Sequence, residues 1–432
     1  MHLCHSSNAG AVSAGYRLIR TVGLFMAFIV TLAFIQFGER PAQGASGLAA
    51  VTAQKLTLRA SASNRGRSVT VLQKGDIVRV VSSKSIWKRV YTSGGKSGWC
   101  QSRYLTDAVY SSSYATGTTT SLDWPSDYIN VSQTHTYWRC LQDIKDLVSA
   151  YPGLARYETI GMSVTGTPIN AIVLGSPGAG KKVLFQAAIH AREGITALIA
   201  MRQAECMLKA ASFGGVYRGV NVADMLNGVE IWVVPIANPD GLRLLHEGIS
   251  AVPASMPALK ASIRKMNGYS NKFIRWKANA RGVDLNRNFE TGWKKDKYYP
   301  KPGPYNYPGT GPLTEPESLA LQDLTLKKDF AMTMSYHSSG KVIYWYNPAT
   351  GYGADYYIAS SLKNITGYRI LSPASQVFNG GYRDWYVSRY NRPGFTLEVG
   401  AGYCPLPQSN FQTYWQETRY VMFDLTWMAA PK

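Results

Sequence analysis

A buried strand that ends in a histidine and a glutamate is the feature that most constrains this fold. Residues 183–196 have the sequence VLFQAAIHAREGIT, in which an apolar run precedes His190 and small, helix-compatible residues follow Glu193. Both side chains are therefore placed at the carboxyl end of a strand, where open α/β sheets bind their ligands. An imidazole and a carboxylate at this spacing can share one metal ion, although a histidine at a strand end more often forms only a hydrogen bond.

Strand-like and helix-like segments alternate from about Leu122 to the C-terminus. Besides the opening strand, strands are predicted at 229–237, 331–336 and 395–399, and helices at 137–151, 195–210 and 409–428. This order predicts an α/β fold for residues 122–432, with a mixed, mostly parallel, doubly wound sheet sandwiched by helices.

The N-terminus has the pattern of a targeting segment. Arg17 and Arg20 precede an apolar run at 22–35, and small residues at 42–45 suit a signal peptidase. A fourteen-residue run is short for a membrane span, which favours a cleaved signal peptide at 1–44 over an uncleaved signal anchor. We therefore expect a secreted or cell-wall-associated protein, with anchoring to the membrane as the alternative.

Residues 45–106 predict a small all-β module. Short strand-like runs alternate with glycine-containing turns at Lys74-Gly75 and Gly94-Gly95. The segments LTLRASAS, VLQKGDIVRVV and WKRVYTSGGKSGWCQSRYLT resemble the bacterial SH3-like domains of cell-wall proteins, which implies a small barrel. The stretch 107–121, rich in Ser, Thr and Gly, follows as a linker.

Positive charge is concentrated in this module. The chain has a formal net charge of +20, of which +18 remains after removal of residues 1–44. Between Lys55 and Arg103 there are eleven Lys or Arg residues and one acid, Asp76. Such a concentration indicates an anionic partner, and in a secreted protein an anionic cell-wall polymer is favoured over nucleic acid. A solvated basic face without a partner is the alternative.

The cysteines do not form a recognisable metal motif. Cys4 lies in the predicted signal, and the remaining four contain no CxxC pair, which argues against a structural zinc site. Three complete disulfide pairings are open to these four, and the sequence favours none of them: Cys100, Cys140, Cys206 and Cys404.

Four more polar motifs follow the opening one within residues 122–432. In chain order, the five motifs are HARE at 190–193, NPDG at 238–241, GVDLNRNF at 282–289, YHSSG at 336–340 and FTLEVG at 395–400. In sequence and in order they resemble the motifs of the zinc metallocarboxypeptidase family. The resemblance extends over essentially all of residues 122–432, and it implies that family's fold and its zinc-dependent hydrolysis of peptide bonds.

The resemblance implies one zinc ion per catalytic domain, bound by His190, Glu193 and His337. Three protein ligands leave a fourth position for water, as in catalytic zinc sites. Glu398 would act as general base and then general acid, and Asp284 would orient His190. The alternatives are a buried, ion-paired carboxylate for Glu398 and a capping role for Asp284.

The same resemblance assigns roles around the substrate. Asn286 and Arg287 match the pair that binds a terminal carboxylate, for which a guanidinium is well suited. Alignment on Trp276 gives Lys277 the role of stabilising the oxyanion, with Arg275 as the alternative.

A specificity pocket is predicted from the sequence GGYRDWY at 380–386. Arg383 aligns with the position that meets the substrate side chain, where a guanidinium selects a carboxylate. The alternative is that Arg383 pairs with a nearby acid such as Asp384. The family's active-site tyrosine has no secure counterpart, because Gln376 falls at its position.

Together these features resemble the bacterial γ-D-glutamyl-diamino-acid peptidases of that family. Meso-diaminopimelate has a second carboxylate on its side chain, which gives a pocket arginine a physical purpose. The resemblance implies hydrolysis of the γ-D-glutamyl–diaminopimelate bond in peptidoglycan stem peptides. The alternatives are a carboxypeptidase that acts on ordinary peptide C-termini and a non-catalytic wall-binding protein. The sequence does not indicate an oligomeric state.

Overall fold

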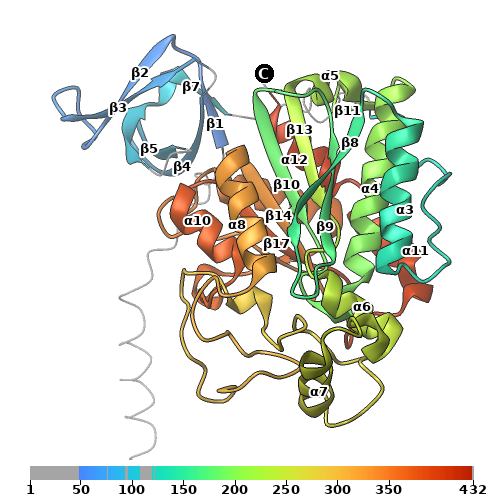
Figure 1. Cartoon of the computed structure of the whole chain (residues 1–432). Helices are drawn as coiled ribbons and strands as arrows, with labels where there is room; N and C mark the ends of the chain where they lie inside the picture. The colour runs from blue at the N-terminus through green and yellow to red at the C-terminus, as the bar shows by residue number, and fades with distance from the viewer. Residues whose placement is uncertain (1–47, 75, 93–95, 108–118, 121, 431–432) are drawn as a thin grey trace, which may run out of the picture. The chain divides into compact units, whose positions relative to one another are not determined.

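The computed structural model of the chain describes residues 48–74, 76–92, 96–107, 119–120 and 122–430 (Figure 1). The predicted signal at 1–44 lies outside the described residues, as does most of the predicted linker at 107–121. Within the described ranges, no helix is long and apolar enough to cross a membrane. These ranges contain an all-β part at 48–107 and an α/β part at 122–430.

The all-β part is a seven-stranded antiparallel sheet with the spatial order β3-β2-β6-β5-β4-β1-β7. Its strands are β1 (Leu48–Val51), β2 (Lys55–Arg59), β3 (Ser68–Gln73), β4 (Ile77–Lys84), β5 (Trp87–Thr92), β6 (Ser97–Gln101) and β7 (Leu105–Asp107). Side chains alternate between its faces, so Leu56 and Leu58 are buried in one small core while Lys55 is exposed. The predicted SH3-like β module is confirmed.

A mixed eight-stranded sheet forms the centre of the α/β part. In spatial order its strands are β16 (Arg369–Ile370), β15 (Val342–Tyr344), β17 (Gly394–Glu398), β14 (Met332–His337), β10 (Lys181–Gln186), β13 (Val229–Val234), β9 (Pro168–Leu174) and β8 (Ala155–Met162). The four strands β13, β10, β14 and β17 are parallel neighbours, so their carboxyl ends share one edge of the sheet. The pairs at the outer sides of these four, β9 with β13 and β15 with β17, are antiparallel.

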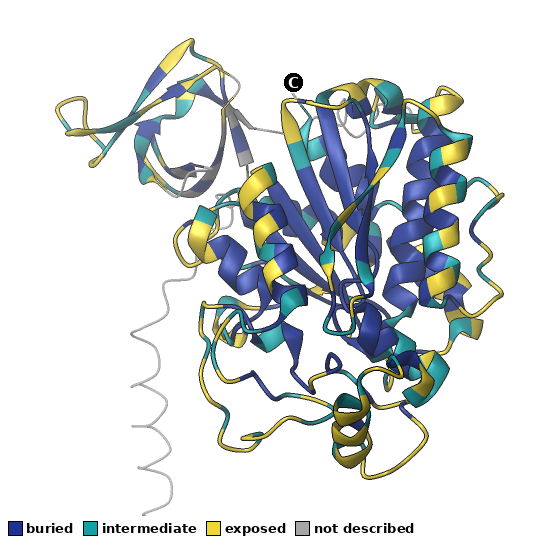
Figure 2. Ribbon diagram, viewed as in Figure 1, coloured by how far each residue is buried: buried dark blue, intermediate teal, exposed yellow. Residues whose placement is uncertain are grey.

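Helices cover both faces of this sheet, as Figures 1 and 2 show. One face packs against α3 (Tyr137–Ala150), α4 (Ile195–Ser212), α5 (Val222–Gly228), α9 (Ala354–Thr366), α11 (Phe411–Thr418) and α12 (Val421–Ala429), and the other against α8 (Pro316–Lys328) and α10 (Tyr382–Tyr390). Consecutive residues of β10 point into opposite cores, Val183 and Phe185 into the first and Leu184 into the second. Because both faces are covered, the central strands are buried nearly throughout, and the predicted α/β sandwich is confirmed.

A third, smaller core lies beside the strand ends. It joins Ala191, Leu244 of α6 (Pro239–Glu247), Ile263 of α7 (Pro257–Met266) and the buried Trp276 of the following loop. This core holds the segment around Trp276 against the HARE motif.

The single helix predicted at 409–428 is wrong, because the chain forms α11 and α12 with a break at Arg419 and Tyr420. At this break the carbonyl oxygen of Thr418 accepts a hydrogen bond from Nε2 of Gln203, at 2.6 Å. Gln203 of α4, which is distant in sequence, thus gives the Thr418 carbonyl oxygen the hydrogen bond that a continuous helix would have supplied.

The four described cysteines are free thiols. Cys100, Cys140 and Cys206 are buried and Cys404 is half-buried. None of the three pairings open from the sequence is present among them.

Candidate active site

His190 and Glu193 lie where β10 leads into α4. The chain stays buried from the end of β10 through Ile189, and a short 3-10 turn at Ala191–Glu193 then precedes α4. The turn brings the two buried side chains to the same side, with Nδ1 of His190 2.8 Å from Oε1 of Glu193. The predicted strand ends at His190, whereas β10 ends at Gln186, so the pair lies just beyond the strand on its connection to α4.

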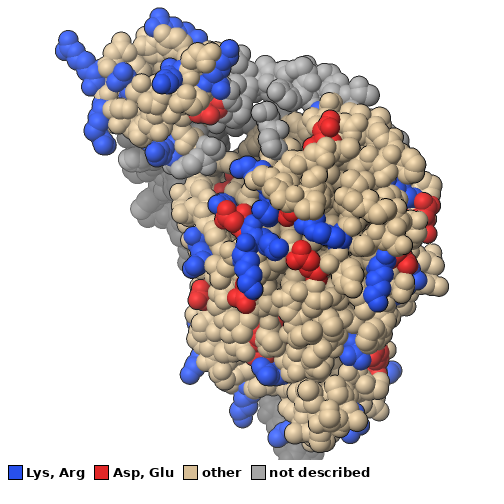
Figure 3. All heavy atoms as spheres, turned by 45° about the horizontal axis from the view of Figure 1, so that its top comes forward, with Lys and Arg blue, Asp and Glu red and all other residues tan. Residues whose placement is uncertain are grey.

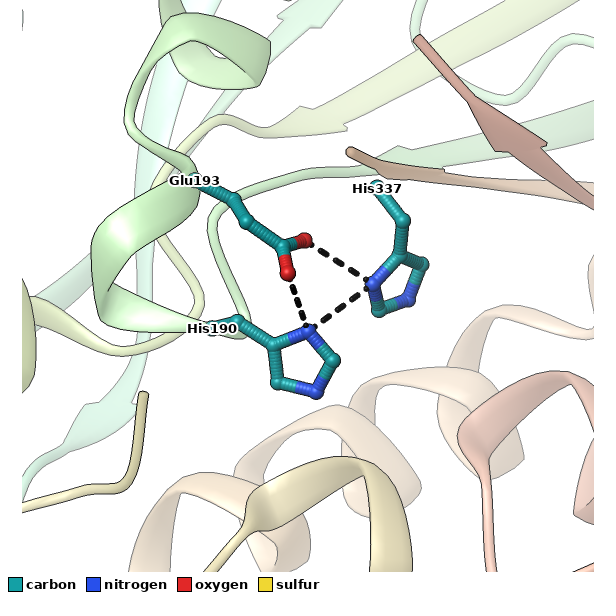
Figure 4. Close-up of side chains that lie close together, drawn as sticks. All are labelled: His190, Glu193 and His337. Carbon is teal, nitrogen blue, oxygen red and sulfur yellow. Dashed lines mark hydrogen bonds and ion pairs between the residues drawn. The ribbon is translucent and has the colours of Figure 1, made fainter. Parts of the chain in front are cut away.

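His337 is the last residue of β14, the strand beside β10. The two strands are parallel, with Gln186 opposite Ser335, so both end at the same edge. Nδ1 of His337 lies 3.1 Å from Oε2 of Glu193 and 3.1 Å from Nδ1 of His190 (Figure 4). Three side chains from two neighbouring strand ends thus point toward one another.

This cluster, His190 with Glu193 and His337, can hold a metal ion. One ligand atom from each residue lies within 4.8 Å of the others. Burial raises the pKa of Glu193, but attraction to His190 and hydrogen bonds from both imidazoles outweigh it and hold the pKa below its usual range. An ionised carboxylate and two imidazole nitrogens are the donor set of many hydrolytic zinc sites. A shared cation would satisfy all three groups at once.

Asp284 supports the cluster from behind His190. Its Oδ1 lies 3.2 Å from Nε2 of His190, and its Oδ2 lies 2.8 Å from Nζ of Lys277. Burial raises the pKa of Asp284, but the charges of Lys277 and His190 outweigh it and hold the pKa well below its usual range. An anionic acceptor at Nε2 favours a proton on that nitrogen, so that Nδ1 can serve as a ligand when a cation replaces its hydrogen bond to Glu193.

Glu398 ends β17 directly beside His337, its partner in the parallel pairing. Its carboxylate is half-buried and makes none of the described hydrogen bonds or ion pairs. Burial raises its pKa to about 7, and the charge of Glu193 acts in the same direction, whereas His337 and Lys277 lower it. A carboxylate with a pKa near neutrality suits a group that must accept and then release a proton.

A cavity of about 540 Å³ opens over these groups. Its lining includes the metal-ligand candidates His190 and Glu193 together with Glu398. The other lining residues are Arg192, Arg275, Lys277, Ser338, Ser339, Gly402, Tyr403 and Cys404. The metal-ligand candidates and the candidate base thus face one space that is large enough for several substrate atoms.

Lys277 and Arg275 both line this cavity, but their surroundings differ. Lys277 is only 14% exposed and is paired with Asp284, and its carbonyl oxygen accepts a hydrogen bond from the backbone N–H of Ala191 at 3.1 Å. Arg275 is exposed and forms no ion pair with any residue that the structure describes. The backbone bond fixes both residues beside the HARE motif.

Asn286 and Arg287 belong to a short turn that follows Asp284. Oδ1 of Asn286 accepts a hydrogen bond from the backbone N–H of Tyr382, at 3.2 Å, which joins the turn to the start of α10. Nε of Arg287 is buried without a hydrogen-bond partner in the described part of the chain and lies 3.8 Å from Oδ2 of Asp284. Their contact with a substrate carboxylate stays a prediction.

Arg383 lies in the first turn of α10 and is 4% exposed. It donates hydrogen bonds to the carboxylate of Asp384, at 3.2 Å, and to the carbonyl oxygens of Gly394 and Tyr346. It is not among the residues that line the cavity. The surroundings match the alternative of a pair with Asp384, and contact with a substrate stays a prediction.

The comparisons with known proteins agree with this geometry. The model of the peptidase M14 family, described as zinc carboxypeptidase, matches residues 140–421 and spans all the predicted metal ligands. The chain belongs to this zinc carboxypeptidase family. A bacterial SH3 domain model matches residues 55–106. The family resemblance seen in the motifs is confirmed.

The individual relatives of this chain have different names. Gamma-D-glutamyl-L-diamino acid endopeptidase 1 of Lysinibacillus sphaericus is 36% identical over 291 residues, which are 67% of this chain and 71% of the relative. Metallocarboxypeptidase A of Trichophyton rubrum is 26% identical over 53% of this chain and 50% of the relative. The crystal structure of thrombin activatable fibrinolysis inhibitor has a TM-score of 0.55 at 19% identity and covers 77% of this chain and 82% of its own, which shows a shared fold.

The sequence analysis assigned no role to some of the residues that line the cavity. They are Arg192, inside the HARE motif, and Tyr403 and Cys404, which follow the Glu398 strand within six residues. Their closeness in sequence to the HARE motif and to the strand that ends at Glu398 could have identified them. Gln376, at the expected tyrosine position, is buried and accepts hydrogen bonds from the backbone N–H groups of Trp345 and Tyr346.

Proposed function

We propose that this chain is a secreted zinc peptidase that hydrolyses the γ-D-glutamyl–diaminopimelate bond of peptidoglycan stem peptides. The observation that carries the proposal is the convergence of His190, Glu193 and His337 at the edge of a cavity that Glu398, the strand neighbour of His337, also lines. The bond is proposed because the Lysinibacillus relative, named for γ-D-glutamyl-L-diamino acids, is 36% identical over two thirds of this chain.

In the proposed reaction, His190, Glu193 and His337 hold the zinc ion, one per catalytic domain. The bound zinc would polarise the scissile carbonyl and lower the pKa of the attacking water to near neutrality. Asp284 keeps His190 in the orientation and tautomer that ligation requires.

Glu398 moves the proton. As a carboxylate it takes a proton from the attacking water while the water oxygen bonds to the γ-carbonyl carbon, and it then gives that proton to the leaving amine as the C–N bond breaks. Its raised pKa, about 7, suits both halves of this cycle near neutral pH. Lys277 lines the same cavity and would stabilise the negative charge that develops on the carbonyl oxygen.

Asn286 and Arg287 would bind a carboxylate of the diamino acid on the leaving-group side. The side chain of Arg287 is 30% exposed, so such a ligand can reach it. Two oxygens of a carboxylate fit the fork of a guanidinium.

A second candidate function is a carboxypeptidase that acts on ordinary peptide C-termini. The observation in its favour is the similarity to metallocarboxypeptidase A of Trichophyton rubrum, at 26% identity. A non-catalytic wall-binding protein is disfavoured, because the three metal-ligand candidates cluster and two of them line one cavity with Glu398.

The β module would hold the enzyme at the cell wall. Eight of its Lys and Arg residues are exposed and form no ion pair with a described carboxylate: Lys55, Arg65, Arg67, Lys74, Lys84, Arg89, Lys96 and Arg103. In Figure 3 the visible face of this module carries mainly basic charged side chains. We propose anionic wall polymers as its partners, since clustered cations attract polyanions.

The test uses purified protein, muropeptides of defined length and ordinary peptides with free C-termini, each with and without a chelator. Chelator-sensitive cleavage confined to the γ-D-glutamyl bond, identified by product mass, is the expected result. Release of C-terminal residues from the ordinary peptides would favour the second candidate. Absence of any cleavage by zinc-loaded protein would contradict both.

A further inference from the structure

The proposed substrate has a negative charge on the acyl side of its scissile bond. In a γ-linked glutamyl residue the attacked carbonyl belongs to the side chain, so the α-carboxylate remains free, separated from it by two methylene groups and the α-carbon. In an α-linked residue of an ordinary peptide the α-carbonyl itself forms the scissile bond, so no free α-carboxylate remains. An enzyme of this bond therefore gains selectivity from a cation on the acyl side.

Two of the cations in the cavity lining form no ion pair with a described residue. Of the three basic residues in its lining, Lys277 is paired with Asp284, whereas Arg192 and Arg275 have no ion-pair partner in the part of the chain that is described. Nε of Arg192 is moreover buried without a hydrogen-bond partner among the described residues. The basic side of the cavity is thus available to an anionic ligand.

Arg275 is held at a fixed place in this lining. Trp276 beside it is fully buried in the small core that contains Ala191, and its Nε1 donates to the carbonyl oxygen of Asn279 at 3.3 Å. The next residue, Lys277, accepts the backbone hydrogen bond of Ala191. The backbone that carries Arg275 is therefore anchored next to His190, while its guanidinium stays exposed.

We propose that Arg275 binds the free α-carboxylate of the D-glutamyl residue and so forms a carboxylate subsite on the acyl side of the scissile bond. The proposal rests on the proposed function. Asn286 and Arg287, the predicted partners of the leaving group, are absent from the described lining of this cavity. Of the two arginines that do line it, Arg275 is exposed, whereas Arg192 is half-buried with its Nε inaccessible, so Arg275 is the arginine that a substrate anion can reach.

The subsite predicts an effect on KM and little effect on kcat. The α-carboxylate does not change during the reaction, so its contact stabilises bound substrate and transition state alike. A residue that stabilises the oxyanion would instead lower kcat. The same difference separates Arg275 from Lys277.

The test compares L-alanyl-γ-D-glutamyl-meso-diaminopimelate with an analogue whose D-glutamyl α-carboxylate is amidated. For the wild type, amidation is expected to raise KM roughly 10- to 100-fold, the usual range for a hydrogen bond to a charged group. Arg275→Ala should raise KM for the free carboxylate by the same factor and add no further loss on the amidated substrate. Arg275→Lys should be intermediate, because an ammonium keeps the charge but not the fork.

Lys272→Ala is the matched control, since it removes an exposed cation from the same loop outside the cavity lining. It should leave both substrates unaffected, and zinc content should be equal in all variants. An equal loss on both substrates in Arg275→Ala, or no loss on either, would overturn the subsite. Wild-type protein that cleaves neither substrate would overturn the proposed function and the subsite with it, so the two failures are distinguishable.

Discussion

The cavity beside the metal-ligand candidates and the start of α10 each present an arginine, in opposite surroundings. Arg275 in the cavity is exposed and has no ion-pair partner among the described residues. Arg383 at α10 is buried and already bonded to Asp384 and to two carbonyl oxygens. A substrate carboxylate can bind Arg275 directly, but it would have to displace Asp384 to reach Arg383. The role of an arginine near a site thus depends on whether its donors are already used within the fold.

The largest effect is expected from Glu398→Gln, which removes the proposed base from the cavity. The amide cannot accept the proton of the attacking water, so kcat should fall about 10³-fold. Steady-state kinetics on a γ-D-glutamyl tripeptide measure this change. Zinc content should stay at the wild-type value, because Glu398 is not a ligand. A loss below tenfold with zinc bound would show that another group carries the proton.

The second-largest effect is expected from Arg383→Ala, which tests whether this buried arginine stabilises the fold. Removal of the guanidinium leaves Asp384 buried without its cation, and we expect a loss of about 3 kcal/mol in the free energy of unfolding. Chemical denaturation measures it, with the exposed Arg389→Ala of the same helix as the control. If stability is unchanged and activity falls only for substrates with a side-chain carboxylate, Arg383 is a specificity residue and the comparison fails.

The third effect concerns Lys277, which lies in the cavity and is also paired with Asp284. Lys277→Met should lower kcat about 100-fold if its ammonium stabilises the oxyanion. It should also shift the acid limb of the kcat/KM profile to higher pH. Glu398 must be ionised to act as a base, and Lys277 is one of the groups that lower its pKa.

The pH profile of Lys277→Arg provides the control for this shift. Arginine keeps the positive charge, so its acid limb should stay close to that of the wild type. An acid limb at an unchanged or lower pH in Lys277→Met would show that Glu398 does not control it.

The smallest effect is expected outside the α/β part. Replacing Lys84, Arg89 and Arg103 by Gln should weaken binding to isolated cell walls several-fold at low salt, while hydrolysis of soluble muropeptides stays unchanged. Co-sedimentation at two salt concentrations measures the binding. Wall binding that is insensitive to both the substitutions and salt would leave the basic module without its proposed partner.

The periodicity of apolar residues was sufficient to predict the four parallel strands at the centre of the sheet and the helices α3 and α4. The strand predicted at 331–336 is observed at Met332–His337, and the helix predicted at 195–210 is observed at Ile195–Ser212. The pattern could not predict the break between α11 and α12, because the side chain that satisfies it, Gln203, is more than two hundred residues away.

The site was predicted in part, for a related reason. His337 ends β14, whereas His190 and Glu193 follow the parallel strand β10 on its connection to α4, so the strand pairing and this short connection bring them together. Arg383 donates hydrogen bonds to the carbonyl oxygens of Gly394 and Tyr346, and no sequence motif indicates these contacts. The sequence shows that an arginine stands at position 383, but only the structure shows which acceptors its N–H groups bind.

The central claim is that one zinc ion on His190, Glu193 and His337 drives cleavage of the γ-D-glutamyl bond. The most direct test is a zinc titration of chelator-treated protein, with cleavage of L-alanyl-γ-D-glutamyl-meso-diaminopimelate followed at each step. We predict a linear rise in activity that ends at one equivalent of zinc, and no recovery in His337→Ala. Full cleavage without added metal, or equal recovery in His337→Ala, would contradict the claim.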